Sequence, residues 1–223
     1  MTSTAAFAAT AAATAAATPA AGAPSGPTPP DLRALVVFAD PSLHRSRISR
    51  RVAQAMTGLP GVLVRDLYQL YPDFYIDVRR ERELVMAAPL VVFVFQLGWY
   101  AMPALLKEWF ENVFKPAWAF EQPSPLAGKA AWAAVACAGA SADYCPGGAH
   151  GRPLHDFLAP LEQTARSCGM GWLDPHVFYG ADAADPDAAT RHAAQLQAQL
   201  AIHAGIAVPA SADGTADGTA NGK

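Results

Sequence analysis

Residues 89–96 read Pro-Leu-Val-Val-Phe-Val-Phe-Gln, and residues 33–40 read Arg-Ala-Leu-Val-Val-Phe-Ala-Asp. Both runs are almost continuously apolar, which is typical of parallel strands that are buried on both faces of a sheet. Three more stretches are predicted to be strands: 62–67, 129–139 and 172–180. Because these five strands alternate with helical patterns, the sequence predicts an α/β fold with a doubly wound, five-stranded parallel sheet and helices on both faces.

The five helices are predicted from capping residues and from apolar residues spaced along one face. They are expected to begin near Ser46, Asp77, Pro103, Phe157 and Asp185. Pro160 is expected either to start or to kink the fourth helix, because proline has no N–H to donate inside a helix. The fifth helix runs towards Ile206.

Composition limits the classes of function. Hydrophobic residues make up 52% of the 223-residue chain and charged residues 16%, so a large core can form, and a net charge of −3 gives no reason to expect nucleic acid. Three cysteines without a paired motif suit a reducing compartment, and no His/Cys cluster has zinc spacing. No apolar run reaches the ~20 residues of a membrane helix, and the N-terminus lacks the basic region of a secretory signal. We therefore expect a cytoplasmic protein with no metal site and no transmembrane segment.

The folded part of the chain is predicted to be one domain, residues 31–208. Residues 1–30 form an Ala/Thr/Pro-rich leader with almost nothing large to bury, and residues 209–223 repeat the small polar sequence Ala-Asp-Gly-Thr. Both ends are expected to be disordered, since they cannot offset the entropy of ordering.

Three loops are expected to form the functional site, because right-handed crossovers bring all strand-to-helix loops to one edge of the sheet. In the first loop, 40–49, the hydroxyls of Ser46 and Ser49 at a helix N-terminus suit a phosphate. An ordinary capped helix explains the same residues equally well. In the second loop, Trp99 and Tyr100 offer a surface on which a flat ring would stack, although such a pair is more often core or interface.

The third loop, 137–144, is rich in small residues, so its backbone can approach a ligand closely. Tyr144 and His150 follow it, and both side chains can donate hydrogen bonds to an oxyanion that develops on a substrate. Taken singly, each of the two residues more often has a structural role. Cys137 is predicted to be a buried, unreactive thiol.

Several motifs, in order along the chain, resemble one known family. They are 66–77 (Asp-Leu-Tyr-Gln-Leu-Tyr-Pro-Asp-Phe-Tyr-Ile-Asp), Trp99-Tyr100 followed by 103–109, 126–129, and 162–165 followed by 168–170. The chain resembles the flavodoxin-like NAD(P)H-dependent quinone oxidoreductases from about Arg33 to Gly180. Within that family it is most similar to the ancillary quinone reductases of glutathione-gated potassium efflux systems. The resemblance implies a flavodoxin-like sheet of order 2-1-3-4-5.

The resemblance also implies an activity and a set of site residues. Members bind FMN or FAD non-covalently as homodimers and pass hydride from NAD(P)H to the flavin and then to quinones in ping-pong fashion. Carried over, the flavin phosphate would be held by Ser46, Arg47, Ile48 and Ser49. The isoalloxazine ring would be bordered by Leu97, Gly98, Trp99 and Tyr100, and by Ala136, Cys137, Ala138 and Gly139. Tyr144 and His150 match the pair that assists hydride transfer.

A second hypothesis stays open, because the three loops depart from the residues usual in the family. Asp40 stands where a histidine is usual, and 136–139 carry fewer hydroxyl groups and glycines. The chain would then be a flavin-poor regulatory subunit that binds a potassium efflux antiporter at the inner face of the membrane. The flavin enzyme is the preferred hypothesis.

Overall fold

The computed structural model describes residues 28–41 and 47–207, except the side chains of 47–50. Its sheet contains β1 (Ala34–Ala39), β2 (Val62–Asp66), β3 (Leu90–Gln96), β4 (Ala130–Ala136), β5 (Gly171–Trp172) and β6 (His176–Phe178). The strands follow the order β2-β1-β3-β4-β5, and β6 also pairs with β4. Every pairing between these strands is parallel. The predicted doubly wound sheet and its order are therefore confirmed.

Seven α-helices occur in the described part of the chain: α1 (Arg47–Thr57), α2 (Leu67–Leu70), α3 (Val78–Ala87), α4 (Ala104–Val113), α5 (Pro116–Ala119), α6 (Leu154–Ser167) and α7 (Pro186–Ala204). Two short 3₁₀ helices also occur: Ser141–Asp143 lies between β4 and α6, and Ala181–Ala183 lies between β6 and α7. None of the helices in the described ranges is both long enough and apolar enough to span a bilayer. The expected leader and tail, 1–30 and 209–223, lie almost wholly outside the described residues.

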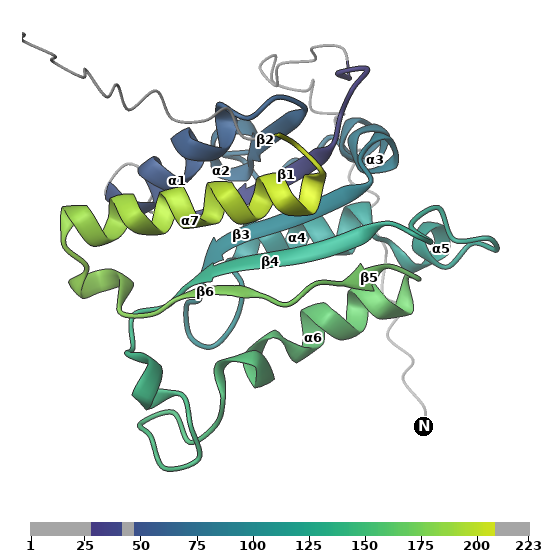
Figure 1. Cartoon of the computed structure of the whole chain (residues 1–223). Coiled ribbons are helices and arrows are strands. Elements are labelled where there is room, and N and C mark those ends of the chain that lie inside the picture. Colours follow the sequence, from purple (N-terminus) through teal and green to yellow (C-terminus); the bar gives the residue numbers. More distant parts are fainter. Residues whose placement is uncertain (1–27, 42–46, 208–223) are drawn as a thin grey trace, which may run out of the picture.

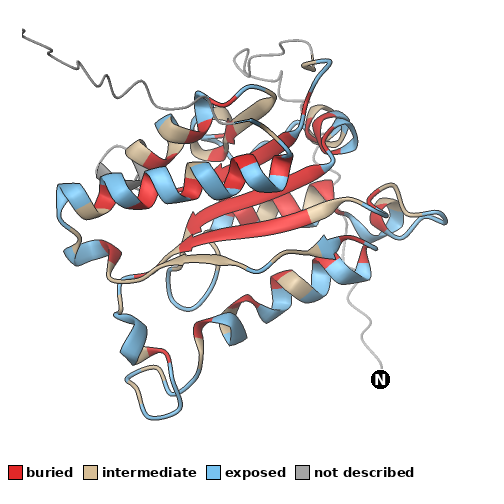
Figure 2. Cartoon of the chain, in the orientation of Figure 1, coloured by how far each residue is buried: buried red, intermediate tan, exposed pale blue. Residues whose placement is uncertain are grey.

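The strands divide the core into two layers, because successive side chains point to opposite faces of the sheet. Leu35, Val37 and Phe93 belong to the core under α2, α3, α4 and α6, whereas Val36 and Phe38 face α1 and α7. Figure 1 shows α1 and α7 together on one face of the sheet. The central strands β1, β3 and β4 are buried almost throughout (Figure 2), so the sheet forms a rigid platform for the loops at its edge.

Two predicted elements differ from the structure. The fourth helix begins at Leu154, three residues before the predicted start, and Pro160 lies inside it, neither starting it nor ending it. The stretch predicted as one strand, 172–180, is divided into β5 and β6. Pro175 lies in the gap between them and has no N–H for a strand ladder.

One buried carboxylate joins four elements on the α3 side of the sheet. Glu81 is fully buried, and its Oε1 accepts hydrogen bonds from Arg65 Nη2 at 2.6 Å and from the Tyr71 hydroxyl at 2.7 Å. Its Oε2 accepts from Trp109 Nε1 at 3.0 Å. The charge of Glu81 is thus paired and hydrogen-bonded, as a buried charge requires. The contacts connect α3 with β2, with the end of α2 and with α4.

On the other face, a pair of histidines joins the edge strand β6 to α7. His176 Nε2 and His192 Nδ1 are 3.1 Å apart, within hydrogen-bond distance. The ring of His192 also stacks on Phe178, with 4.0 Å between centroids and 13° between planes. Burial, and then the neighbouring His176, lowers the pKa of His192 to about 4. The pair is therefore neutral at pH 7, and His176 and His192 are each other's hydrogen-bond partner.

Candidate functional site

Backbone hydrogen bonds hold the second and third loops together at the carboxyl edge of the sheet. The Leu97 amide, just beyond β3, donates to the Ala136 carbonyl at 2.8 Å. Beyond β4, the Cys137 amide donates to the Phe178 carbonyl at 2.9 Å. The expected convergence of these loops is therefore present.

Trp99 and Tyr100 form the tip of a two-residue hairpin. Gly98 and Ala101 exchange two backbone hydrogen bonds, of 3.1 and 3.0 Å, and both tip residues have positive φ, 48° for Trp99 and 63° for Tyr100. Such turns usually carry asparagine and glycine, since other residues are strained in this conformation. The strain is kept although the Trp99 side chain is 96% exposed. Two strained aromatic residues at the carboxyl edge of the sheet indicate a functional position.

Tyr144 and His150 pack together over Gly139. Their ring centroids are 4.3 Å apart, and a Cβ at Gly139 would lie 2.9 Å from His150 Nε2 and 3.1 Å from Tyr144 Cε2. Glycine is needed here because any side chain would displace these two rings. The loop is closed by Asp143, whose Oδ2 accepts from the Ala140 amide at 2.8 Å. The structure thus brings together Gly139, Tyr144 and His150, and their predicted roles in binding and catalysis stay a prediction.

Tyr100 connects the second loop to the third. Its hydroxyl is 3.4 Å from His150 Nδ1, and its ring stacks on Phe157 of α6 at 5.0 Å and 27°. Trp99, by contrast, has no ring contact within the described residues and projects from the edge. Tyr100 therefore joins the aromatic cluster, and the predicted Trp99–Tyr100 platform is divided between two environments.

The Tyr144 hydroxyl is kept in its protonated form. Burial raises the pKa of Tyr144 to about 12, and the neighbouring Cys137 thiol adds to the increase. Burial also raises the pKa of Cys137, whose side chain is fully enclosed. Tyr144 is therefore a hydrogen-bond donor across the physiological pH range, and Cys137 is the buried thiol that the sequence predicted. Only its backbone can face a ligand.

The first loop is described only at its two ends. Ser46 lies outside the described residues, and so do the side chains of Arg47, Ile48 and Ser49, although their backbone forms the first turn of α1. The predicted phosphate contacts stay a prediction. Asp40 is only 2% exposed and lines an interior cavity, so its carboxylate is directed away from solvent.

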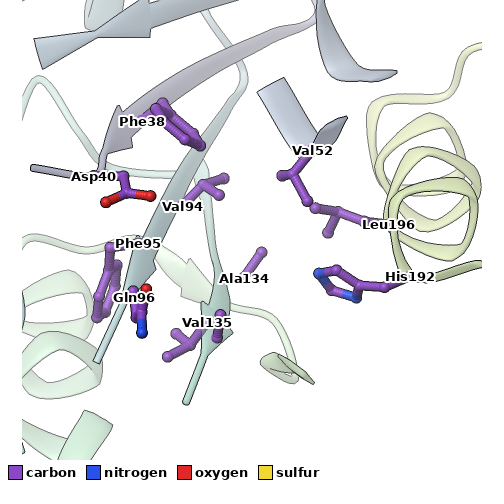
Figure 3. Close-up of a pocket in the computed structure, with 11 residues that line it drawn as sticks. Phe38, Asp40, Val52, Val94, Phe95, Gln96, Ala134, Val135, His192 and Leu196 are labelled. Atoms are coloured by element: carbon purple, nitrogen blue, oxygen red, sulfur yellow. The ribbon is translucent and has the colours of Figure 1, made fainter. Parts of the chain in front are cut away.

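That cavity lies between the carboxyl ends of β1, β3 and β4 and helices α1 and α7. Its lining includes Phe38, Asp40, Gln96, His192 and Leu196, and Figure 3 shows His192 and Leu196 reaching towards the strands from α7. The space open to the centre of a water-sized sphere is about 20 Å³, which accommodates about one water molecule. This cavity is therefore too small for a planar ligand.

Comparison with known proteins identifies the family. The model of a family described as having a flavodoxin-like fold matches residues 33–200. The chain belongs to this flavodoxin-like family. The carboxyl-edge loops of this flavodoxin-like protein therefore occupy the position where ligands of doubly wound sheets bind.

Several solved structures have the same fold, and this chain aligns with nearly the whole length of each of them. A thermophilic tryptophan halogenase from Streptomycin violaceusniger is 34% identical, with a TM-score of 0.71, and the match covers 73% of this chain and 95% of that one. General stress protein 14 of Treponema denticola, in complex with FMN, is 29% identical, with a TM-score of 0.72 and coverage of 76% and 98%. An NADPH-quinone reductase from P. pentosaceus is 24% identical, with a TM-score of 0.69 and coverage of 75% and 96%, and shows the shared fold alone.

Several residues around the flavodoxin-like edge were not predicted as site residues. Phe157 supports Tyr100, and Tyr179 lies beside Tyr144 with 5.6 Å between ring centroids. Gln96 Nε2 donates to Asp182 Oδ1 at 3.1 Å across the loops. In the sequence, Phe157 and Tyr179 are marked only by being aromatic residues near the ends of the loops at this edge. Within the described ranges, no cluster of three or more His, Cys, Asp or Glu residues has the geometry of a metal site.

Proposed function

We propose that this protein is a flavin-dependent NAD(P)H oxidoreductase that passes two electrons to quinones or similar acceptors. The observation that carries the proposal is the packing of Tyr144 and His150 over Gly139, with the Tyr100 hydroxyl beside His150, at the carboxyl edge of a flavodoxin-like sheet. FMN is preferred over FAD because a 29% identical structure of the same fold is an FMN complex.

The described residues fit a flavin. The space beside Gly98 is open, since a Cβ there would have no neighbour within 4 Å, so the backbone at Gly98 can approach a ligand closely. Trp99 and Tyr100 present ring surface at the same edge, and aromatic rings stack well on a planar conjugated ring. The phosphate would be held by the amides of the first turn of α1, where the helix dipole favours an anion.

The flavin, when bound, would supply the acceptance of hydride from NAD(P)H and its transfer to the acceptor. The protein's own residues would bind and orient the reactants and donate hydrogen bonds. Tyr144, protonated because its pKa is raised to about 12, would donate to an oxygen of the acceptor as negative charge develops there. His150 beside it would do the same through a ring N–H. By analogy with the family, we also propose ping-pong turnover and a homodimer.

The first experiment is the visible spectrum of the purified protein, before and after addition of FMN or FAD. The proposal expects a flavin spectrum that NAD(P)H bleaches and a quinone restores. Tyr144→Phe and His150→Ala should each lower quinone reduction while the flavin stays bound; unchanged turnover in both would refute their assignment as catalytic residues. Arg166→Gln, an exposed change on α6, is the control.

A protein that takes up neither flavin would contradict the enzyme proposal. It would favour the second hypothesis, a regulatory subunit that binds a potassium efflux antiporter, and a pull-down with that antiporter would test it. Product analysis with tryptophan, halide, reduced FMN and dioxygen as the oxidant is a useful further assay, because a 34% identical protein is named for halogenation.

A further inference from the structure

His150 is held between two loops, and its two ring nitrogens face different surroundings. Nδ1 faces the hydroxyl of Tyr100 at 3.4 Å. Nε2 faces the opposite direction, over Gly139, where a Cβ would lie only 2.9 Å away. A neutral imidazole has one donor and one acceptor nitrogen, so the partner of Nδ1 determines what Nε2 can do.

The position of the Tyr100 hydroxyl is fixed from three directions. The backbone is held in the hairpin between Gly98 and Ala101 by two hydrogen bonds. The ring stacks on Phe157 of α6 and meets the edge of the His150 ring, with centroids 5.6 Å apart. The side chain is therefore anchored although it is half exposed, and its hydroxyl is presented to His150 from a different loop.

We propose that Tyr100 is a positioning residue that sets the tautomer and orientation of His150. The Tyr100 O–H donates to Nδ1, which places the ring proton on Nε2, the nitrogen that lies over Gly139. His150 is thereby prepared as a hydrogen-bond donor next to Tyr144. At 3.4 Å this is a long hydrogen bond.

The role in turnover rests on the proposed function, whereas the tautomer itself does not. A tyrosine hydroxyl that only stabilised the loop would leave the imidazole protonation pattern unchanged when it is removed. The matched change is Tyr100→Phe, because it keeps the ring, the stacking on Phe157 and the positive-φ backbone and removes only the oxygen. Tyr75→Phe is the control, since Tyr75 is 74% exposed and lies outside the aromatic cluster.

The experiment records ¹⁵N spectra of the histidine rings in the purified full-length protein, with His150 assigned by comparison with His150→Gln. We expect Nδ1 to be unprotonated and Nε2 protonated in the wild type and in Tyr75→Phe. In Tyr100→Phe the two tautomers should mix. With FMN bound, kcat for quinone reduction should fall about fivefold in Tyr100→Phe, the effect of losing about one ordinary hydrogen bond, while the Kd for FMN is unchanged.

Two results would overturn the inference. An unchanged His150 tautomer in Tyr100→Phe would show that the hydroxyl does not set it, and a changed tautomer with unchanged kcat would show that the setting has no catalytic consequence. If the protein binds no flavin, the proposed function fails separately, and the ¹⁵N spectra still decide whether Tyr100 positions His150.

Discussion

The buried histidine pair predicts a specific loss of stability in mild acid. The pKa of His192 is lowered to about 4 in the folded protein, and it returns to about 6.5 on unfolding. A histidine whose folded pKa is depressed favours the neutral form in the fold, so its contribution is fully present above pH 6.5 and is lost as the pH falls towards 4. Between pH 7 and pH 5 this linkage lowers the free energy of unfolding by about 2 kcal/mol.

The assay is urea unfolding, followed by tryptophan fluorescence, at pH 7 and at pH 5. His192→Phe retains an aromatic ring between Phe178 and His176 but cannot be protonated, so we expect its pH-dependent loss to be smaller by about 2 kcal/mol. The control is His155→Phe, at an exposed position of α6, which should lose as much as the wild type. Equal losses in all three proteins would refute the reasoning, since the buried ring would then not be the group that titrates.

Three further changes test other features of the structure. Glu81→Gln leaves the buried Arg65 charge poorly paired and should lower the free energy of unfolding by about 3 kcal/mol. The control Glu83→Gln, at a partly exposed ion pair, should change it by less than about 0.5 kcal/mol. Equal effects of the two changes in urea unfolding would contradict this. Gly139→Ala should lower quinone turnover about tenfold or more with the far-ultraviolet spectrum unchanged, because its Cβ meets the imidazole. Trp99→Gly should raise the free energy of unfolding by up to about 1 kcal/mol and weaken FMN binding; a lower free energy of unfolding would show that the turn is not strained.

The main elements of the fold were predictable because their signals are local. Asp77 and Asp185 cap α3 and α7 as expected, since a carboxylate before an apolar-periodic stretch is a strong start signal. The short helix α2 was missed because its cap, Asp66, also ends a strand and only four residues follow. The position of Pro160 inside α6 depends on tertiary packing, which no local pattern reports.

The site was predictable only in part. The positions of Tyr144 and His150 near Gly139 follow from the loop they share, and the family resemblance drew attention to the pair. The contact of Tyr100 with His150 was not predictable, because it depends on a turn with two positive φ angles at residues that rarely adopt them. The contact of Phe157 with Tyr100 was not predictable either, because it depends on α6 beginning at Leu154.

The buried Glu81 also has a consequence for how the chain assembles. Its carboxylate oxygens receive donors from β2 and the end of α2, which are near one another in sequence, and from Trp109 of α4, 28 residues further along the chain than Glu81. In a folding intermediate that has docked α3 but not α4, the buried Glu81 carboxylate would lack part of its hydrogen bonds. The free energy of such an intermediate rises as water is excluded from around the carboxylate. Half-assembled forms are therefore disfavoured, and hydrogen exchange in β2, α3 and α4 should report one shared opening reaction rather than three separate ones.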